Sequence, residues 1–355
     1  MSGVAVFGEV VSADEAPDAD VLALDDAMRA FVVENVGKTG NSVARFRRLL
    51  RSLDSQGYFT ASYDAATTHS AIDTFHTRSG NCLSFTNLFV ALGREANLRT
   101  VYQIVDVPPS WDAHNGYLIR FTHINVVVKG ARIDRINTAQ YTVDFNDVVP
   151  NADYRRREVS DSYAQALFYG NLSVAELRNG EVRRSFAYLK KAIELEPGNE
   201  DLWINLGAFY ATQAAPEEAI RAYQIALSLN GSSKASMSGL ARSLEAIGEN
   251  GLAASYATKV RRYRLKNPFY HFAVAQAEFQ NSNYELAIYS IDKAIDLKRR
   301  NPRFYLLKGL AEQKLGDDAA AEKSFDKARR YGKSEENKLR MREDLLSLVP
   351  GQPVT

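Results

Sequence analysis

The sequence has a single cysteine, Cys82, among its 355 residues. One cysteine cannot form an intramolecular disulfide, so the fold depends on packing rather than on covalent cross-links. No stretch approaches the roughly 18 to 20 consecutive apolar residues that span a bilayer. Residues 1–20 also lack the basic start and the sustained apolar run of a signal peptide. Their acidic, Ala- and Pro-rich composition predicts a flexible lead-in.

The chain has almost no excess charge of either sign. Lys and Arg number 44 against 43 Asp and Glu, which gives a formal net charge of +1. This balance argues against a domain whose main task is to neutralise phosphates. The histidines show no metal-ligand spacing, and the sequence contains no glycine-rich phosphate loop. We therefore expect no nucleic-acid partner, no metal and no cofactor.

The C-terminal half repeats itself every 34 residues, from Ala166 to about Glu335. Small residues recur at one position of the repeat: Ser173, Gly207, Ala241, Ala275 and Gly309. A second position, 16 residues after the first, holds Leu189, Tyr223, Ala257, Ile291 and Phe325. Small residues are needed where two helices approach closely, and larger ones fill the gaps one turn away. Turn signals fall in phase with the repeat, so the pattern predicts a series of helix pairs.

This pattern resembles the tetratricopeptide repeat family over five consecutive units, residues 163–335, followed by a capping helix and tail, residues 336–355. The resemblance implies an all-α superhelix whose concave face is lined by the first helix of each pair. On that register, the candidate residues for binding a protein or peptide partner are Arg242, Phe272, Gln276, Phe279, Gln280 and Lys314. The alternative is an ordinary repeat surface, with Phe272 and Phe279 packed inside.

In the N-terminal half, Cys82 stands at the start of a predicted helix. Gly80-Asn81 predicts a turn, and the apolar residues from Leu83 to Leu92 follow helical spacing. Backbone N–H groups in the first turn of a helix are unpaired, and the helix dipole favours an anion there. Both effects favour a thiolate nucleophile, and the same amides can donate to an oxyanion. Cys82 is therefore a candidate nucleophile, and the alternative is a small buried thiol.

Two further residues complete a candidate catalytic set. The segment THINVVVKGARIDR predicts a hairpin with His123 at the head of its first strand, where the imidazole can face the start of a helix. Asp144 lies in the next strand-like run and can fix the tautomer of the imidazole. Asp134, on the second strand of the hairpin, is the alternative for this third position.

Four other residues compete for these roles or could assist them. His76 precedes Cys82 by six residues, and His114 lies in a predicted loop. Gln103, on the strand after the helix, is a candidate for the second oxyanion donor. Trp111 either lines an acyl-binding cleft or anchors a loop.

A cysteine at a helix start, a histidine on one strand and an aspartate on the next resemble the transglutaminase-like superfamily. The segments that carry the resemblance are SAIDTFHTRSGNCLSFTNLFVALGREANL, THINVVV and QYTVDF, within a domain of residues 21–162. The resemblance implies an α+β papain-like fold with Cys82 as nucleophile, His123 as general base and then acid, and Asp144 as orienting acid. Ser84 departs from the family pattern, because many members carry an acidic residue there.

The whole chain thus resembles bacterial transglutaminase-like proteins that carry C-terminal tetratricopeptide repeats. Such relatives are often secreted or lipid-anchored, which implies a periplasmic or lipid-anchored protein whose signal has been removed. A cytoplasmic protein is the alternative.

We expect an enzyme whose thiol attacks an amide or ester carbonyl and passes through a thioester, with either hydrolysis or transfer to an amine as the outcome. In this hypothesis the repeats concentrate a protein or peptide substrate. The alternative is a non-catalytic scaffold that binds partners through the repeats. A third hypothesis has the repeats packing on the thiol domain and gating its cleft, because the link between them is short.

Overall fold

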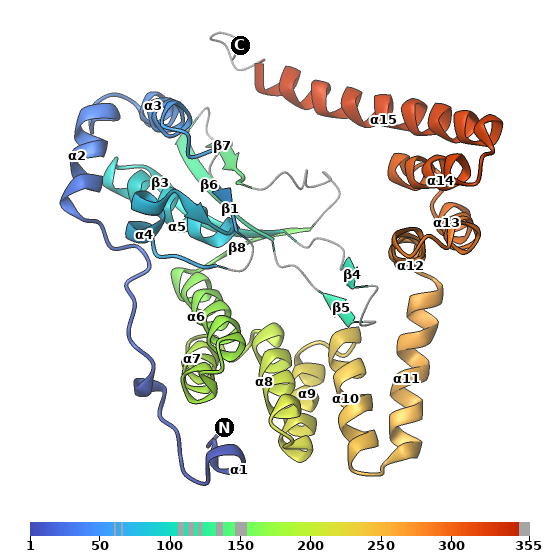
Figure 1. Ribbon diagram of the computed structural model, residues 1–355. Coiled ribbons are helices and arrows are strands. Elements are labelled where there is room, and N and C mark those ends of the chain that lie inside the picture. Colours follow the sequence, from blue (N-terminus) through green and yellow to red (C-terminus); the bar gives the residue numbers. More distant parts are fainter. Residues whose placement is uncertain are drawn as a thin grey trace. The chain divides into compact units, whose positions relative to one another are not determined.

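The computed structural model of the protein describes residues 1–59, 62–64, 67–105, 110–112, 117–119, 123–132, 138–145 and 155–347 (Figure 1). The chain divides into two units, Met1–Pro108 with Phe121–Ala253, and Pro109–Arg120 with Ala254–Thr355.

The first unit begins with helices and short strands and continues into the first repeats. Its N-terminal elements are α1 (Val4–Phe7), the 3₁₀ helix η1 (Ala13–Glu15), α2 (Asp26–Asn35), α3 (Ser42–Ser55), β1 (Ser62–Tyr63), α4 (Ala71–Thr77), β2 (Ser79–Gly80) and α5 (Cys82–Glu95). Strands β3 (Arg99–Val105), β6 (His123–Arg132), β7 (Thr138–Val143) and β8 (Arg156–Val159) follow. The repeat helices of this unit are α6 (Asp161–Arg178), α7 (Val182–Leu195), α8 (Glu200–Thr212), α9 (Pro216–Leu229) and α10 (Lys234–Ala246).

The second unit contains the remaining repeat helices and two short strands. Its elements are β4 (Ser110–Asp112), β5 (Tyr117–Ile119), α11 (Asn250–Leu265), α12 (Pro268–Gln280), α13 (Tyr284–Leu297), α14 (Pro302–Lys314) and α15 (Asp318–Ser347). The division between the two units falls within α11.

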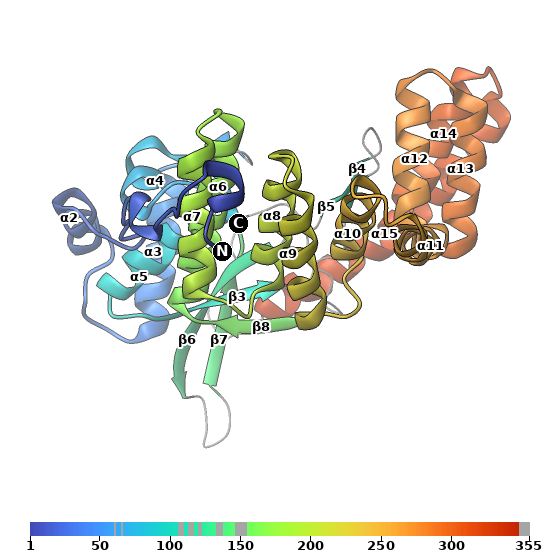
Figure 2. The same ribbon diagram turned by 90° about the horizontal axis from the view of Figure 1, so that it is seen from below.

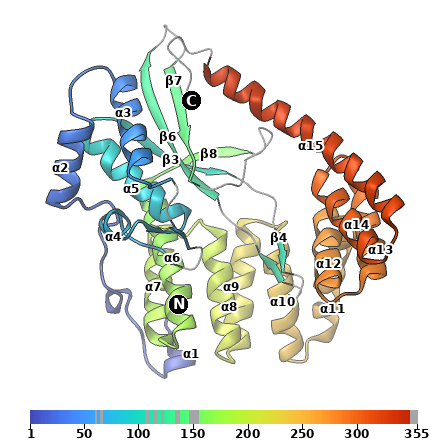
Figure 3. The ribbon, with the colours of Figure 1, turned by 45° about the horizontal axis from the view of Figure 1, so that its top comes forward.

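An antiparallel sheet with strand order β7-β6-β3-β8 forms the centre of the N-terminal domain. Figure 3 shows α5 beside this sheet. Every residue of α5 from Leu83 to Gly93 is buried, as the apolar sequence of the helix requires. The buried Tyr102 of β3 donates a hydrogen bond of 2.7 Å to Asn87 Oδ1 of α5. On another side, Phe46 of α3 packs edge-on against Phe89. The helix is thus held on several sides at once.

In two of the repeats, the small residue at the first repeated position is a glycine, and it faces an aromatic ring at the second repeated position. A Cβ added to Gly207 would lie 2.6 Å from the Tyr223 ring, and one added to Gly309 would lie 2.6 Å from the Phe325 ring. Where the second position holds Leu189 or Ile291, the first position holds Ser173 or Ala275, so the combined volume of the two side chains is similar to that of the glycine–aromatic pairs. The third repeat departs from this pattern, because Ala241 and Ala257 are both small.

Two of the expected segment boundaries differ from the structure. Residues 3–18, which we call the docked segment, pack along α7 instead of forming a flexible lead-in, because Val11, Ala13 and Ala16 find buried positions. Figure 2 shows the dark-blue start of the chain beside α7. The expected capping helix is the continuation of α15, which runs unbroken to Ser347; no proline stands between Asp318 and Pro350 to interrupt it.

The packing of Tyr223 gives a stability prediction. A Cβ at Gly239 of α10 would lie 2.2 Å from the Tyr223 ring, so Gly239→Ala should force the buried ring to move. We expect a loss of about 1–3 kcal/mol in the free energy of unfolding, measured by urea denaturation followed by circular dichroism. The matched control is Gly251→Ala, because nothing lies within 4 Å of a Cβ at Gly251. Equal losses in both variants would contradict this account of the packing.

Candidate active site

The site is built around the start of α5. Asn81 caps this helix: its Oδ1 accepts the Ser84 N–H at 3.1 Å, and its Nδ2 donates to Thr68 Oγ1 at 2.6 Å. The cap makes Cys82 the first residue of the helix, where backbone N–H groups and the helix dipole favour negative charge. As a whole residue, Cys82 is intermediate between buried and exposed.

Ser84, in the first turn of the helix, is packed against the backbone that precedes the cysteine. Ser84 is fully buried; its Oγ accepts the His69 N–H at 2.9 Å and donates to Asn81 Oδ1 at 3.2 Å. Gly80 has φ +137°, and a Cβ there would lie 2.6 Å from the Ser84 Cβ. An acidic side chain at position 84 would have to be buried against this backbone, where it would lose its solvation.

The structure brings His123 and Asp144 together from adjacent strands. His123 is the first residue of β6, Asp144 follows the end of β7, and the distance from Nε2 to Oδ2 is 2.7 Å. The His123 side chain is only 3% exposed and that of Asp144 is 20% exposed. Cys82 also interacts with the imidazole, because it contributes with Asp144 to the raised pKa of His123. Since Nε2 is engaged by the carboxylate, Nδ1 is the ring nitrogen that remains available to another group.

The surroundings of His123 favour its protonated form. Burial lowers the pKa of His123, but the hydrogen bonds to Asp144 and Cys82 and the attraction to both groups outweigh it and raise the pKa to about 9. An imidazole with this pKa is charged at neutral pH and can deliver a proton.

Asn125 also lies against the Asp144 carboxylate, and the sequence did not identify it as a site residue. Its Nδ2 donates to Asp144 Oδ2 at 3.3 Å, the oxygen that also binds His123, and the residue is 1% exposed. Since a carboxylate only accepts hydrogen bonds, it fixes which end of the Asn125 amide faces it. The signal was present in the sequence, because side chains two residues apart on a strand point to the same face.

The other candidates occupy different places. Gln103, expected as an oxyanion donor, lies on β3 opposite Asn125. In the described part of the chain, its buried Oε1 has no hydrogen-bond partner, nor has Asn125 Oδ1. His76 Nε2 pairs with Asp25 Oδ2 at 2.5 Å, away from the thiol. His114 and Asp134 lie outside the described residues. Trp111 belongs to β4, in the second unit.

The predicted partner-binding residues fall on three helices. Arg242 is on α10, in the first unit, and the others are on α12 and α14, in the second unit. The two phenylalanines have partners within the repeats: Phe272 lies 5.0 Å from the Phe304 ring and Phe279 lies 5.4 Å from the Tyr284 ring. The polar side chains are exposed: Arg242, Gln276, Gln280 and Lys314. A role in binding stays a prediction for this set.

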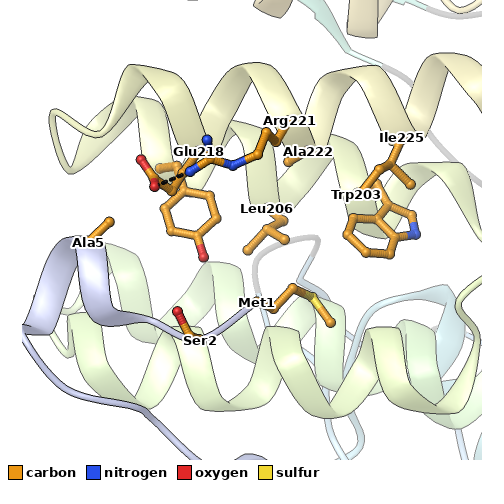
Figure 4. Close-up of a pocket in the computed structure, with 10 residues that line it drawn as sticks. Met1, Ser2, Ala5, Trp203, Leu206, Glu218, Arg221, Ala222 and Ile225 are labelled. Atoms are coloured by element: carbon orange, nitrogen blue, oxygen red, sulfur yellow. Dashed lines mark hydrogen bonds and ion pairs between the residues drawn. The ribbon is translucent and has the colours of Figure 1, made fainter.

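A pocket of about 290 Å³ lies elsewhere in the first unit, between the start of the chain and helices α8 and α9 (Figure 4). Trp203, Leu206 and Ile225 give it apolar walls, and an ion pair between Glu218 and Arg221 lies at its edge. None of the lining residues belongs to the N-terminal sheet and its helices. This pocket is therefore separate from Cys82.

Two further observations concern the described residues alone. Their His, Cys, Asp and Glu side chains form no group of three or more that could hold a metal ion. Their helices include none with the length and apolar character needed to cross a membrane.

The environment of His123 predicts a pH dependence. The pKa of about 9 in the folded chain lies above the ordinary 6.5, so the protonated imidazole stabilises the fold. This stabilisation, on the order of 3 kcal/mol, is fully present below about pH 6.5 and is lost as the pH rises through about 9. We expect Asp144→Asn to lower the His123 titration midpoint and to remove most of this stabilisation.

The measurement is an NMR titration of the histidine ring signals, combined with urea unfolding at several pH values. The other four histidines serve as internal controls, and their midpoints should not change between the two proteins. A His123 midpoint near 6.5 in the wild type would contradict the described environment.

Sequence models of the tetratricopeptide repeat match residues 171–237, 238–302 and 302–328. No curated protein matches the chain. A crystal structure of MamA is 20% identical, covers 54% of this chain and 98% of its own, and has a TM-score of 0.28. MamA from Desulfovibrio magneticus RS-1 is 20% identical, with coverages of 49% and 97% and a TM-score of 0.28. YrrB, described as a TPR protein with an unusual peptide-binding site, is 16% identical, with coverages of 50% and 92% and a TM-score of 0.27. The C-terminal part of the chain thus carries tetratricopeptide repeats in an all-helical array.

Proposed function

We propose that the protein is a partner-binding tetratricopeptide scaffold that carries a thiol acyl-transfer site. The observation that carries the catalytic half of the proposal is the position of His123, whose Nε2 lies 2.7 Å from Asp144 Oδ2 and whose raised pKa owes part of its shift to Cys82. A histidine held between an acid and a thiol at a helix start is the arrangement that activates a cysteine nucleophile.

In this proposal the Cys82 sulfur attacks the carbonyl carbon of an amide or ester and forms a tetrahedral oxyanion. The Ser84 N–H is engaged by Asn81, so the backbone amides of Cys82 and Leu83 are the candidates to donate to that oxyanion. Collapse of the intermediate breaks the bond to the leaving group and leaves a thioester on Cys82. The leaving group departs with a proton.

His123 supplies that proton. Its raised pKa of about 9 means that the imidazole is protonated at neutral pH before the reaction starts, so it acts first as the acid. The neutral imidazole that results then takes a proton from water or from an amine, which attacks the thioester and releases the acyl group. Asp144 holds the ring in place through Nε2 in both steps.

The second candidate function is a scaffold without catalysis. The tetratricopeptide repeats indicate protein or peptide partners, and folds of this kind often bind partners without chemistry of their own. In that case the thiol domain would be structural and Cys82 would react as an ordinary, half-buried thiol. The two candidates therefore differ in what the thiol does.

Alkylation of Cys82 by iodoacetamide separates them, because the chain has no other cysteine. At neutral pH we expect His123→Ala to slow alkylation by about tenfold or more, since the charged imidazole no longer supports a thiolate. The matched control is His76→Ala, which removes an imidazole that pairs with Asp25 instead, and it should leave the rate unchanged. Equal rates in all three proteins would favour the scaffold without catalysis.

A further inference from the structure

The face of α7 holds the docked segment, which contains the short helices α1 and η1, in the way that a receptor holds a peptide. Lys190 donates to the carbonyl oxygen of Val11 at 2.9 Å, and Lys191 donates to that of Ala16 at 3.0 Å. Contacts from side chains to backbone carbonyls do not depend on the sequence of the segment. They can therefore hold another chain whose backbone follows the same path.

The basic residues of α7 face acidic residues of the docked segment. Arg183 of α7 donates from Nη1 to Glu9 at 2.7 Å and from Nε to Glu15 at 2.6 Å, while Lys191 pairs with Asp18 at 2.5 Å. The hydrogen bond from Arg183 lowers the pKa of Glu15, so this carboxylate is charged at neutral pH. The α7 face thus selects acidic residues at defined positions of the segment.

Toward the N-terminus of the docked segment, the binding face also includes an aromatic contact and a pocket. The Phe7 ring packs edge-on against the buried Phe186 with 5.7 Å between the centroids, and the Arg183 guanidinium lies over Phe7. Beyond Phe7, residues Met1, Ser2 and Ala5 line the pocket on α8 and α9, whose volume is about 290 Å³ (Figure 4). Its apolar walls can accept an apolar side chain.

The docked segment is held by contacts that a competitor can replace. Two of its acidic side chains are exposed, Glu9 by 65% and Asp18 by 92%, so each of these ion pairs taken singly contributes little to stability. Its helix α1 has four residues and no side-chain cap, so α1 is not stable by itself. The buried residues of the segment are small, apart from Val11.

We propose that the α7 face, with the pocket on α8 and α9, is a binding site for a segment of another protein whose backbone follows the same path as the docked segment. The docked segment is its intramolecular occupant. From N- to C-terminus, the partner segment carries an apolar side chain for the pocket, an aromatic residue for Phe186, and acidic residues for Arg183 and Lys191. This inference rests on the partner-binding half of the proposed function and is independent of the chemistry at Cys82.

The test uses the full chain and a fluorescent synthetic peptide with the sequence of residues 2–19. Phe7→Ala with Glu15→Ala weakens the resident segment, and we expect this double variant to bind the peptide about tenfold or more tightly than the wild type. The reason is that the tethered wild-type segment competes at an effective concentration on the order of millimolar. Fluorescence anisotropy gives the affinities.

Adding Arg183→Ala to the double variant should weaken peptide binding by about tenfold or more. The matched control is Arg184→Ala, which removes the neighbouring arginine that pairs with Glu176 of α6 instead and should leave binding unchanged. The proposal is overturned if the peptide binds neither protein, or binds the wild type and the double variant equally.

Two other outcomes would also overturn it. If the double variant loses hydrogen-exchange protection throughout α6 and α7, the segment is an integral part of the fold. If the wild type dimerises with rising concentration in sedimentation experiments and Arg183→Ala prevents this, the site belongs to the segment of a second copy. Alkylation of Cys82 is read separately, so a failure here leaves the proposed thiol chemistry untouched.

Discussion

The burial of α5 is the constraint on which the N-terminal domain depends. Its residues from Leu83 to Gly93 are enclosed by the sheet and by neighbouring helices, so the helix cannot slide or rotate without opening the core. The Asn81 cap fixes where this immobile helix begins, and that position belongs to Cys82. The placement of the thiol is therefore a consequence of packing. The two strand residues that meet it are fixed in turn by the register of β6 and β7.

The same helix connects the candidate site to the repeats. Arg94, in the last turn of α5, donates two hydrogen bonds to the Asp161 carboxylate at 2.5 and 2.8 Å, and Asp161 is the first residue of α6. This hydrogen-bonded pair lowers the pKa of Asp161. Next to it, Ala19 donates its N–H to Tyr169 of α6 and accepts from Gln165. The helix that begins at Cys82 thus ends in hydrogen-bonded contact with the first residue of the repeats.

The sequence predicts most completely what depends on neighbours along the chain. The alternation of small and large residues in the repeats is local and periodic, so it predicts the helix pairs and the glycines that face Tyr223 and Phe325. The helix start at Cys82 follows from Gly80-Asn81 for the same reason. What the sequence could not supply depends on distant contacts. The composition of the docked segment, acidic and poor in large apolar residues, predicts flexibility. Its docking depends on distant partners on α7, which are Phe186 for the Phe7 ring and Arg183, Lys190 and Lys191 for its carboxylates and carbonyl oxygens. From the sequence, Asn125 is only one polar residue in a predicted strand. Its contact with Asp144 depends on the pairing of β6 with β7.

The most direct test of the thiol chemistry is intact-mass spectrometry after mixing the protein with an activated ester such as p-nitrophenyl acetate. We expect one acyl group on Cys82 of the wild type, lost again in water and lost faster when an amine is added. His123→Ala should acquire it about tenfold or more slowly under the same conditions. An unmodified wild-type chain, or equal acylation of the two proteins, would contradict the proposal that His123 and Cys82 work together.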